Sequence, residues 1–212
     1  MPDFAPAVRR KPLKKLRRLR RADLPAETLA LTRYLIGKTL VHDLAEGRVS
    51  GRIVETEAYP IGDAAAHSFR GQTPRNRSLF LARGHSYVYF AYGSCWMMNV
   101  SAEGAGVGAG VLIRALDPVD GIEIMERNRG VSRPTDLTRG PGRLAQAMHI
   151  DKSQDGLDLC SPASPLWLGS ALQPPAEIGV TTRIGLSREA HRQWRFYERG
   201  NPFVSGPKSL LL

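Results

Sequence analysis

The sequence predicts an α+β fold: a single domain with a mainly antiparallel, strongly curved sheet and peripheral helices. Three observations lead to this class. The chain has 212 residues, 42% of them hydrophobic, which is enough to bury one full core. Its 15 prolines and 21 glycines divide it into short elements. Its candidate strands come in neighbouring pairs and do not alternate with helices, which favours antiparallel pairing over a parallel sheet.

The first predicted elements are a helix and two hairpins. Residues 24–36 are expected to be helical, with Pro25 in the first turn and Gly37 as the stop signal. Residues 39–44 and 49–59 are predicted to pair across a turn that contains Ala-Glu-Gly. A second hairpin is predicted for residues 86–92 and 95–102, with Gly93-Ser94 as its sharp turn.

The later elements are shorter. An apolar strand is predicted for residues 110–116, ended by Pro118. Short helices are expected at residues 120–127 and 141–148, the second of which opens with a proline. The remaining strand candidates are residues 166–168, 181–184 and 195–197.

Composition excludes several classes of protein. No apolar run approaches the ~20 residues that a membrane span needs, and no signal peptide is recognisable. Cys95 and Cys160 form no C-x-x-C pair, which fits a reducing compartment. The five histidines show no metal-binding spacing. We therefore expect a cytoplasmic protein, associated with the nucleoid if bacterial, that uses no metal or cofactor and does not bind membranes.

Positive charge is concentrated at the N-terminus. Residues 1–22 carry nine basic side chains and one acidic side chain, a net charge of +8, whereas the remaining 21 basic and 19 acidic side chains leave +2. Such a block repels itself and suits a polyanion, because each phosphate that it neutralises releases counterions. Residues 1–22 are predicted to form a flexible arm that binds nucleic acid, with a targeting or membrane-surface role, or an inert tail, as alternatives. Residues 23–212 are predicted to form the single domain.

Two carboxylates stand in an otherwise apolar strand, in the stretch GRIVETEAYPIGDAAAHSFRG. Because side chains alternate along a strand, Ile53, Glu55, Glu57 and Tyr59 are predicted to share one face. A solvent-exposed face would explain a lone glutamate. Here Tyr59 ends the same face and His67 follows shortly after it, a combination of carboxylate, aromatic ring and imidazole that suits a catalytic site.

Three tyrosines follow within six residues. Tyr87 and Tyr89 are predicted to face the same way, and core packing is the ordinary explanation for either of them. Tyr92 directly precedes Gly93 and should therefore stand at a hairpin tip, a position poorly placed for a core. An aromatic ring there is well placed to wedge into a base stack.

Seven segments, in order, carry a resemblance to a known family: GRIVETEAY, AAAHS, QTPRNR, YVYFAYG, MNV, VLIRALDP and GPGRLAQAM. They resemble the alkyladenine (3-methyladenine) DNA glycosylases of animals and bacteria, over about residues 29–206. The resemblance implies a monofunctional glycosylase that flips a damaged purine out of double-stranded DNA and hydrolyses its N-glycosidic bond. It implies no lyase activity, and a monomer is expected.

The resemblance also implies catalytic roles. Glu57, the second glutamate of ETEAY, matches the catalytic residue that activates water. One carboxylate suffices, because a cationic base such as 3-methyladenine is already a good leaving group. Arg114 matches the residue that helps to hold the water and the carboxylate, although it could equally be a structural ion-pair partner.

Further matches concern DNA. Tyr59, His67 and Tyr89 match residues that enclose the flipped base, and Asn99 matches the residue that discriminates against guanine. Tyr92 matches the wedge that replaces the extruded nucleotide.

The GPG segment is a weaker signal. The backbone amides of Gly140 and Gly142, at a helix start, could receive a DNA phosphate, and Arg143 could add a contact. Two departures from the animal enzymes leave the lesion preference open: a loop between Tyr59 and His67 that is one residue shorter, and small residues after the wedge.

Two rival functions remain at this stage. One is a basic nucleic-acid-binding module in which Glu57 is structural. The other is an O-glycosidase that uses Glu55 and Glu57, which would lie about 6.6 Å apart on one strand face, close to the separation of inverting enzymes.

Overall fold

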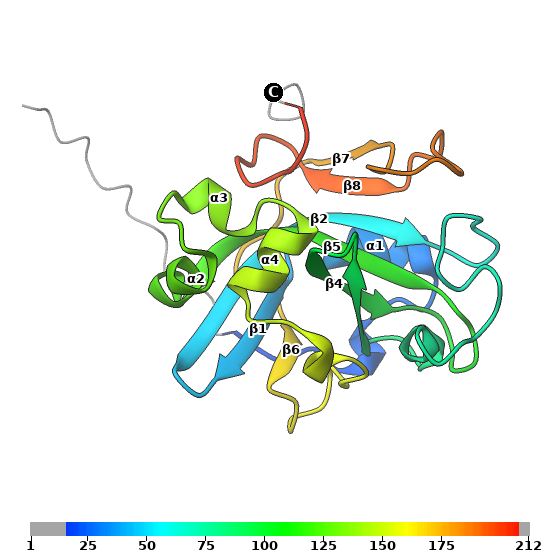
Figure 1. The fold of residues 1–212 in the computed structure, drawn as a ribbon, viewed down its shortest axis with the longest axis horizontal. Helices are drawn as coiled ribbons and strands as arrows, with labels where there is room; N and C mark the ends of the chain where they lie inside the picture. Colours follow the sequence, from blue (N-terminus) through cyan, green and yellow to red (C-terminus); the bar gives the residue numbers. More distant parts are fainter. Residues whose placement is uncertain (1–15, 208–212) are drawn as a thin grey trace, which may run out of the picture.

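The computed structural model describes residues 16–207. Within them, eight strands form one sheet whose main path runs β3-β4-β5-β2-β1-β6, and the sheet curls into a half-barrel (Figure 1). Every strand pair is antiparallel. The strands are β1 (Thr39–Leu44), β2 (Gly47–Tyr59), β3 (Ser86–Ala91), β4 (Cys95–Ser101), β5 (Gly110–Asp120), β6 (Leu166–Gly169), β7 (Ile178–Thr181) and β8 (Arg195–Glu198). The predicted α+β class with a curved antiparallel sheet is confirmed.

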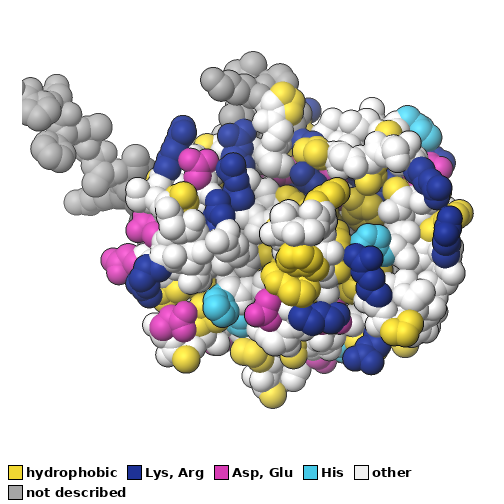
Figure 2. All heavy atoms as spheres, viewed as in Figure 1, with side chains coloured by type: hydrophobic (Ala, Val, Ile, Leu, Met, Phe, Trp, Pro, Cys, Tyr) yellow, Lys and Arg dark blue, Asp and Glu magenta, His cyan; other side chains and the backbone are white. Residues whose placement is uncertain are grey.

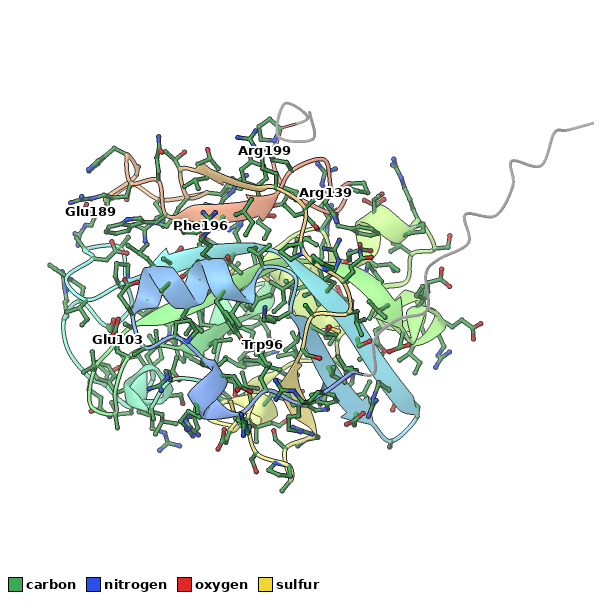
Figure 3. The ribbon with its side chains drawn as sticks, turned by 180° about the vertical axis from the view of Figure 1, so that it is seen from behind. Trp96, Glu103, Arg139, Glu189, Phe196 and Arg199 are labelled. Atoms are coloured by element: carbon green, nitrogen blue, oxygen red, sulfur yellow. The ribbon has the colours of Figure 1, made fainter. Side chains whose placement is uncertain are left out.

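The helices are short and lie around the sheet. They are α1 (Thr28–Leu35), α2 (Ile122–Arg129), α3 (Pro134–Thr138) and α4 (Pro141–Ala147), with 3-10 turns η1 (Arg21–Asp23), η2 (Arg77–Phe80) and η3 (Lys152–Gln154). Helix α1 packs on β2 and β5 and crosses the sheet in the view from behind (Figure 3). Helices α2, α3 and α4 group together, and α4 packs on β4 and β5 (Figure 1).

Strand β2 is the longest strand and organises the sheet. Its first half pairs with β1 and residues 55–57 pair with β8, while β5 runs along its other edge. From Val49 to Ala58 every residue is buried. A polar side chain in the second half of β2 therefore has to find its partners inside the protein.

The first helix is shorter than predicted. Residues 24–27 are not part of it, because the carboxylate of Glu27 caps α1 by accepting hydrogen bonds from the backbone amides of Leu29 and Ala30. Glu103, labelled in Figure 3, accepts further hydrogen bonds from the amide and hydroxyl of Thr28. Two caps thus fix the start of α1 at Thr28.

Other element boundaries also differ from the predictions. Strand β5 continues through Pro118 to Asp120, where the sheet has a register shift and β4 no longer runs beside β5. A proline is tolerated in such an edge position because no hydrogen bond needs its missing N–H. Strand β7 lies at Ile178–Thr181 instead of residues 181–184, and α3 was not predicted.

The described part of the predicted arm packs against the body. The amide of Leu19 donates to the Leu168 carbonyl, the side chain of Leu19 is buried, and the guanidinium of Arg18 lies 4.3 Å from the centre of the Trp167 ring. Residues 16–22 therefore belong to the folded body. Residues 1–15 lie outside the described residues, and the arm stays a prediction for them. Among the described residues, no helix has the length and apolar character that crossing a membrane requires.

Candidate active site

A paired irregularity in β2 and β5 turns the two glutamates away from the main core. Ile53 lies opposite Leu116, Glu55 opposite Ala115 and Thr56 opposite Ile113, so the register skips one residue on each strand. Ile53 and Leu116 consequently belong to the main core, whereas Val54 and Ala115 belong to a second, smaller cluster. The prediction that Ile53 shares a face with the glutamates is wrong, because the bulge reverses the alternation between Ile53 and Glu55.

The carboxylate of Glu57 is fully buried and bound on several sides. Its Oε1 accepts a hydrogen bond of 2.8 Å from the backbone amide of Ile184 and lies 3.2 Å from Nη1 of Arg114. Its Oε2 accepts a hydrogen bond of 2.9 Å from the hydroxyl of Tyr59. Three donors, one of them charged, thus bind the carboxylate and fix its position.

Arg114 joins Glu57 to Glu55. Its Nε donates to Oε1 of Glu55 at 3.1 Å, while its Nη1 faces Glu57. Glu55 also accepts hydrogen bonds from the amide and hydroxyl of Ser205 and lies 3.2 Å from Nε of Arg195. Burial alone would lower the pKa of Arg114, but the two carboxylates hold the pKa above its usual value. Arg114 is thus held in place by Glu55 and directed at Glu57.

A cavity of about 110 Å³ lies directly beside this network. Tyr59 and Arg114, which both bind Glu57, form part of its wall, so the catalytic candidate lies directly behind that wall. The other lining residues are mostly aromatic or apolar: Ala65, Ala66, His67, Ser68, Leu79, Tyr87, Tyr89, Tyr92, Met97, Asn99, Gly110, Leu112, Ile184 and Leu186. The structure therefore brings Glu57, Arg114, Tyr59, His67, Tyr89, Asn99 and Tyr92 together around one cavity.

The rings in the cavity wall form a connected aromatic group. Tyr87 and Tyr89 stack with their centres 5.2 Å apart, which confirms that they face the same way, and the His67 ring meets Tyr89 edge-on at 4.5 Å. Nδ1 of His67 is hydrogen bonded to the Tyr87 hydroxyl at 2.9 Å. Such an arrangement presents ring faces and edges to a flat ligand.

The titratable rings of His67, Tyr59 and Tyr87 in the wall have pKa values shifted toward their neutral forms. The surrounding protein atoms, and then the nearby charge of Arg75, lower the pKa of His67. Burial raises the pKa of Tyr87 to about 12. Burial and the Glu57 carboxylate raise the pKa of Tyr59 well above its usual range, so that its hydroxyl keeps the proton that it donates to Glu57. The cavity thus combines neutral rings with one buried ion-pair network.

Tyr92 stands at the tip of the β3–β4 hairpin, at the rim of the cavity. It is 81% exposed, as the sequence predicts for a tip residue. The turn differs slightly from the prediction: Tyr92 and Gly93 are its central residues, with φ of 53° and 64°, and the Ser94 amide donates to the Ala91 carbonyl. In Figure 2, exposed hydrophobic side chains gather near the middle of the face, with Lys and Arg side chains on either side.

The GPG segment lies next to this hairpin but apart from the cavity lining. Gly140 caps the short helix α4, and a Cβ atom on Gly142 would stand 2.8 Å from Sγ of Cys95. Gly142 is therefore needed for the close approach of α4 to β4. Arg143 is exposed and forms an ion pair of 3.2 Å with Asp136. These placements leave the predicted contacts to a DNA phosphate untested.

Several residues of the site were not found from the sequence. Ile184 and Leu186 line the cavity from the segment after β7, and Ile184 also binds Glu57. Met97 and Leu112 complete the apolar wall. None of these residue types signals a site by itself, and Ile184 acts through its backbone, which leaves no trace in the sequence.

Comparisons with known proteins agree on one family. The family model of methylpurine-DNA glycosylase (MPG) matches residues 22–202, which include Glu57, Arg114 and all the residues that line the cavity. A protein of Mesorhizobium japonicum, named provisionally as a 3-methyladenine DNA glycosylase, is 67% identical over 190 residues, 90% of this chain and 91% of that protein. Proteins with the same name from Paraburkholderia phytofirmans and Chlorobium phaeobacteroides are 54% and 44% identical, over 92% and 86% of this chain and 91% and 92% of those proteins.

Proposed function

The chain belongs to the methylpurine-DNA glycosylase family, and from this premise we propose that it flips alkylated or deaminated purines out of double-stranded DNA and hydrolyses their N-glycosidic bond with water activated by Glu57. As a member of this family it is a DNA repair enzyme and a hydrolase of N-glycosyl bonds. The observation that carries the finer proposal is the buried Glu57 carboxylate, bound by Tyr59 and Arg114 directly behind an aromatic cavity.

The reaction needs one base and one leaving group. Water attacks C1′ of the sugar while the carboxylate of Glu57 takes a proton from the water. The bond from C1′ to the base nitrogen breaks, and its electron pair goes to the base, which leaves as neutral 3-methyladenine because the bound lesion is a cation. Arg114 holds Glu57 and balances the negative charge before the proton arrives.

The wall of the cavity suits the flipped base. Ring faces of Tyr59, Tyr89 and His67 attract an electron-poor alkylated purine by stacking and by cation–π interaction. Asn99 is buried and lines the same cavity, where it would crowd the exocyclic amino group of guanine. Hypoxanthine lacks that group and is therefore a second expected substrate. It is bound as a neutral base, so it leaves as an anion that then takes up a proton from solvent water.

The outer residues suit double-stranded DNA. Tyr92 is exposed at the rim, where its ring would fill the gap that the extruded nucleotide leaves in the stack. We propose that the arm of residues 1–15 adds contacts to phosphates, that Gly140, Gly142 and Arg143 receive one further phosphate, and that the protein acts as a monomer. The O-glycosidase alternative receives no support from the cavity. Tyr59, Arg114 and Ile184, which bind Glu57, all line it, whereas Glu55 binds Arg114 together with Ser205 and Arg195, which do not line it.

Excision assays test the proposal. Double-stranded DNA that carries 3-methyladenine, hypoxanthine or ethenoadenine is incubated with the intact protein and with Glu57→Gln, and the free base is measured. Release by the intact protein and none by the variant supports the proposal. Binding of the damaged DNA without any release would instead favour a non-catalytic binding module.

A further inference from the structure

A buried ion pair ties together two segments that form part of the site. Asp63 follows β2, and Arg183 follows β7; the side chains of both are fully buried. Nη1 of Arg183 contacts Oδ2 of Asp63, and Nη2 donates to Oδ1 at 3.1 Å, so the guanidinium and the carboxylate meet with two parallel contacts. This geometry is the most directional one that an ion pair offers.

The same arginine supports the ring of Tyr59. Nη1 of Arg183 donates to the carbonyl of Ala58 at 2.9 Å, directly before Tyr59 in the chain. The guanidinium lies 4.6 Å from the centre of the Tyr59 ring and 5.0 Å from that of Trp194. It therefore contacts the ring of a cavity-lining residue while Asp63 fixes its orientation.

The residue after Arg183 contacts the catalytic candidate. The amide of Ile184 donates to Oε1 of Glu57 at 2.8 Å. Residues 182–194 contain no helix or strand, so this amide is not fixed by regular backbone hydrogen bonding. Arg183, buried and bound on both sides, is the adjacent anchor that keeps the amide directed at the carboxylate.

We propose that Asp63 and Arg183 are positioning residues for excision, which hold the Ile184 amide on Glu57 and the Tyr59 ring in the cavity wall. The inference rests on the proposed role of Glu57. Neither residue lines the cavity, so both act through Glu57 and Tyr59.

A purely structural role would produce a different pattern of effects. The charged and titratable groups around Glu57 are Tyr59 on its own strand, Arg114 on β5, Arg195 opposite it on β8 and Tyr89 on β3, with Glu55 on the other side of Arg114. These groups remain when the ion pair is weakened, whereas the Ile184 amide moves. One hydrogen bond to the Glu57 carboxylate is then lost, so the position of the acidic limb of the pH–rate profile should differ from that of the intact protein.

The test uses two variants and a matched control. Arg183→Lys keeps the buried positive charge but loses the two parallel contacts and the flat stacking surface, and Asp63→Asn keeps the shape but loses the charge. The control is Glu198→Gln, which weakens another buried ion pair, with a contact of 2.6 Å from Glu198 to Arg52. Single-turnover release of 3-methyladenine from methylated double-stranded DNA is measured against pH, below the melting temperature of each variant.

Arg183→Lys and Asp63→Asn are expected to slow excision about 10- to 100-fold, the usual result of a small misplacement, and to shift the acidic limb of the pH–rate profile. Glu198→Gln should lower the melting temperature and leave the profile unchanged. If both positioning variants have a lower melting temperature but an unchanged acidic limb of the pH–rate profile, the inference is overturned. If Asp63→Asn does not fold, the result for Arg183→Lys decides alone. Glu57→Gln serves as the reference. If it stays active, the proposed function itself fails. If it is inactive but the pH–rate profiles of Arg183→Lys and Asp63→Asn are unchanged, only the role of the ion pair is overturned.

Discussion

The two halves of β2 both bury charge, yet only one of them lies beside a cavity. In the first half, Arg52 lies 2.6 Å from Glu198 and 3.2 Å from Asp117. In the second half, Arg114 lies 3.1 Å from Glu55 and 3.2 Å from Glu57. Burial alone would lower the pKa of each arginine, and in both cases the neighbouring carboxylates raise it above the usual value.

The difference lies in what surrounds each cluster. Arg52 and its partners take no part in the wall of the aromatic cavity, whereas Arg114 and the Tyr59 hydroxyl connect Glu57 to that wall. Buried charge alone is therefore not the sign of a site. A buried carboxylate becomes a candidate base when all of its side-chain contacts, as for Glu57, border a space that a ligand can enter.

The largest effect on excision is expected for Glu57, in the second half of β2. Glu57→Gln should reduce the rate of single-turnover excision by about 10²- to 10⁴-fold, because the amide keeps the shape of the side chain but cannot take a proton from water. Binding of lesion-containing DNA should be largely retained. The measurements are the rate of base release and fluorescence anisotropy with labelled double-stranded DNA.

Two variants serve as controls for this prediction. Glu198→Gln, which weakens the contact of β8 to Arg52 in the first half of β2, should keep its excision rate. Glu55→Gln should lower stability by about 3–5 kcal/mol, the usual result of breaking a buried ion pair, while keeping measurable excision. An inactive Glu55→Gln beside an active Glu57→Gln would reverse our assignment of the two carboxylates.

Tyr92, at the rim of the cavity, is expected to affect DNA binding. Tyr92→Ala should weaken binding to double-stranded DNA about 10- to 100-fold, because unstacking costs a few kcal/mol when no ring fills the gap. Binding to single-stranded DNA should change less, since it has no paired stack to fill. The two affinities are compared at one salt concentration, and equal losses on both would mean that Tyr92 has no wedge function.

How far the sequence predicts such a site depends on the range of the contacts. Glu57 and Tyr59 are two residues apart on one strand, so alternation placed them together correctly. Alternation failed at Ile53, because the bulge at Val54 comes from the pairing with β5 and has no local signature. The Ile184 amide and Arg183 lie more than 100 positions from Glu57 and Asp63, and no local pattern could have joined them.

Deleting the charged residues among residues 1–15 is expected to have a smaller effect, on the salt dependence of DNA binding. Residues 1–15 carry five basic side chains and one acidic side chain. Deleting them should flatten the plot of log K against log salt by up to about 4 units, because each lost phosphate contact contributes about −0.9. Single-turnover excision at saturating protein should hardly change. Binding to undamaged double-stranded DNA is measured at several salt concentrations, and an unchanged slope would mean that the arm does not touch DNA.

The smallest effect is expected at an exposed ion pair, in contrast to the buried ones of β2. Arg143→Ala removes the contact to Asp136, which contributes about 0–1 kcal/mol to stability at such an exposed site. If Arg143 contacts a phosphate as proposed, the salt slope should flatten by about 0.9. A change in stability without a change in slope would remove Arg143 from the DNA surface.

The packing of the residues before Asp23 also bears on solubility. The amide of Ser170 donates to the carbonyl of Arg17, and the amide of Leu19 donates to the carbonyl of Leu168, so this segment lies along β6 at the end of the sheet. An uncovered sheet edge is a template for aggregation between molecules. Removing residues 1–22 would uncover this edge and delete the buried side chain of Leu19. Removing residues 1–15 would leave the edge covered and Leu19 in place. Residues 17–19 thus cover a sheet edge that would otherwise be open to pairing with another molecule.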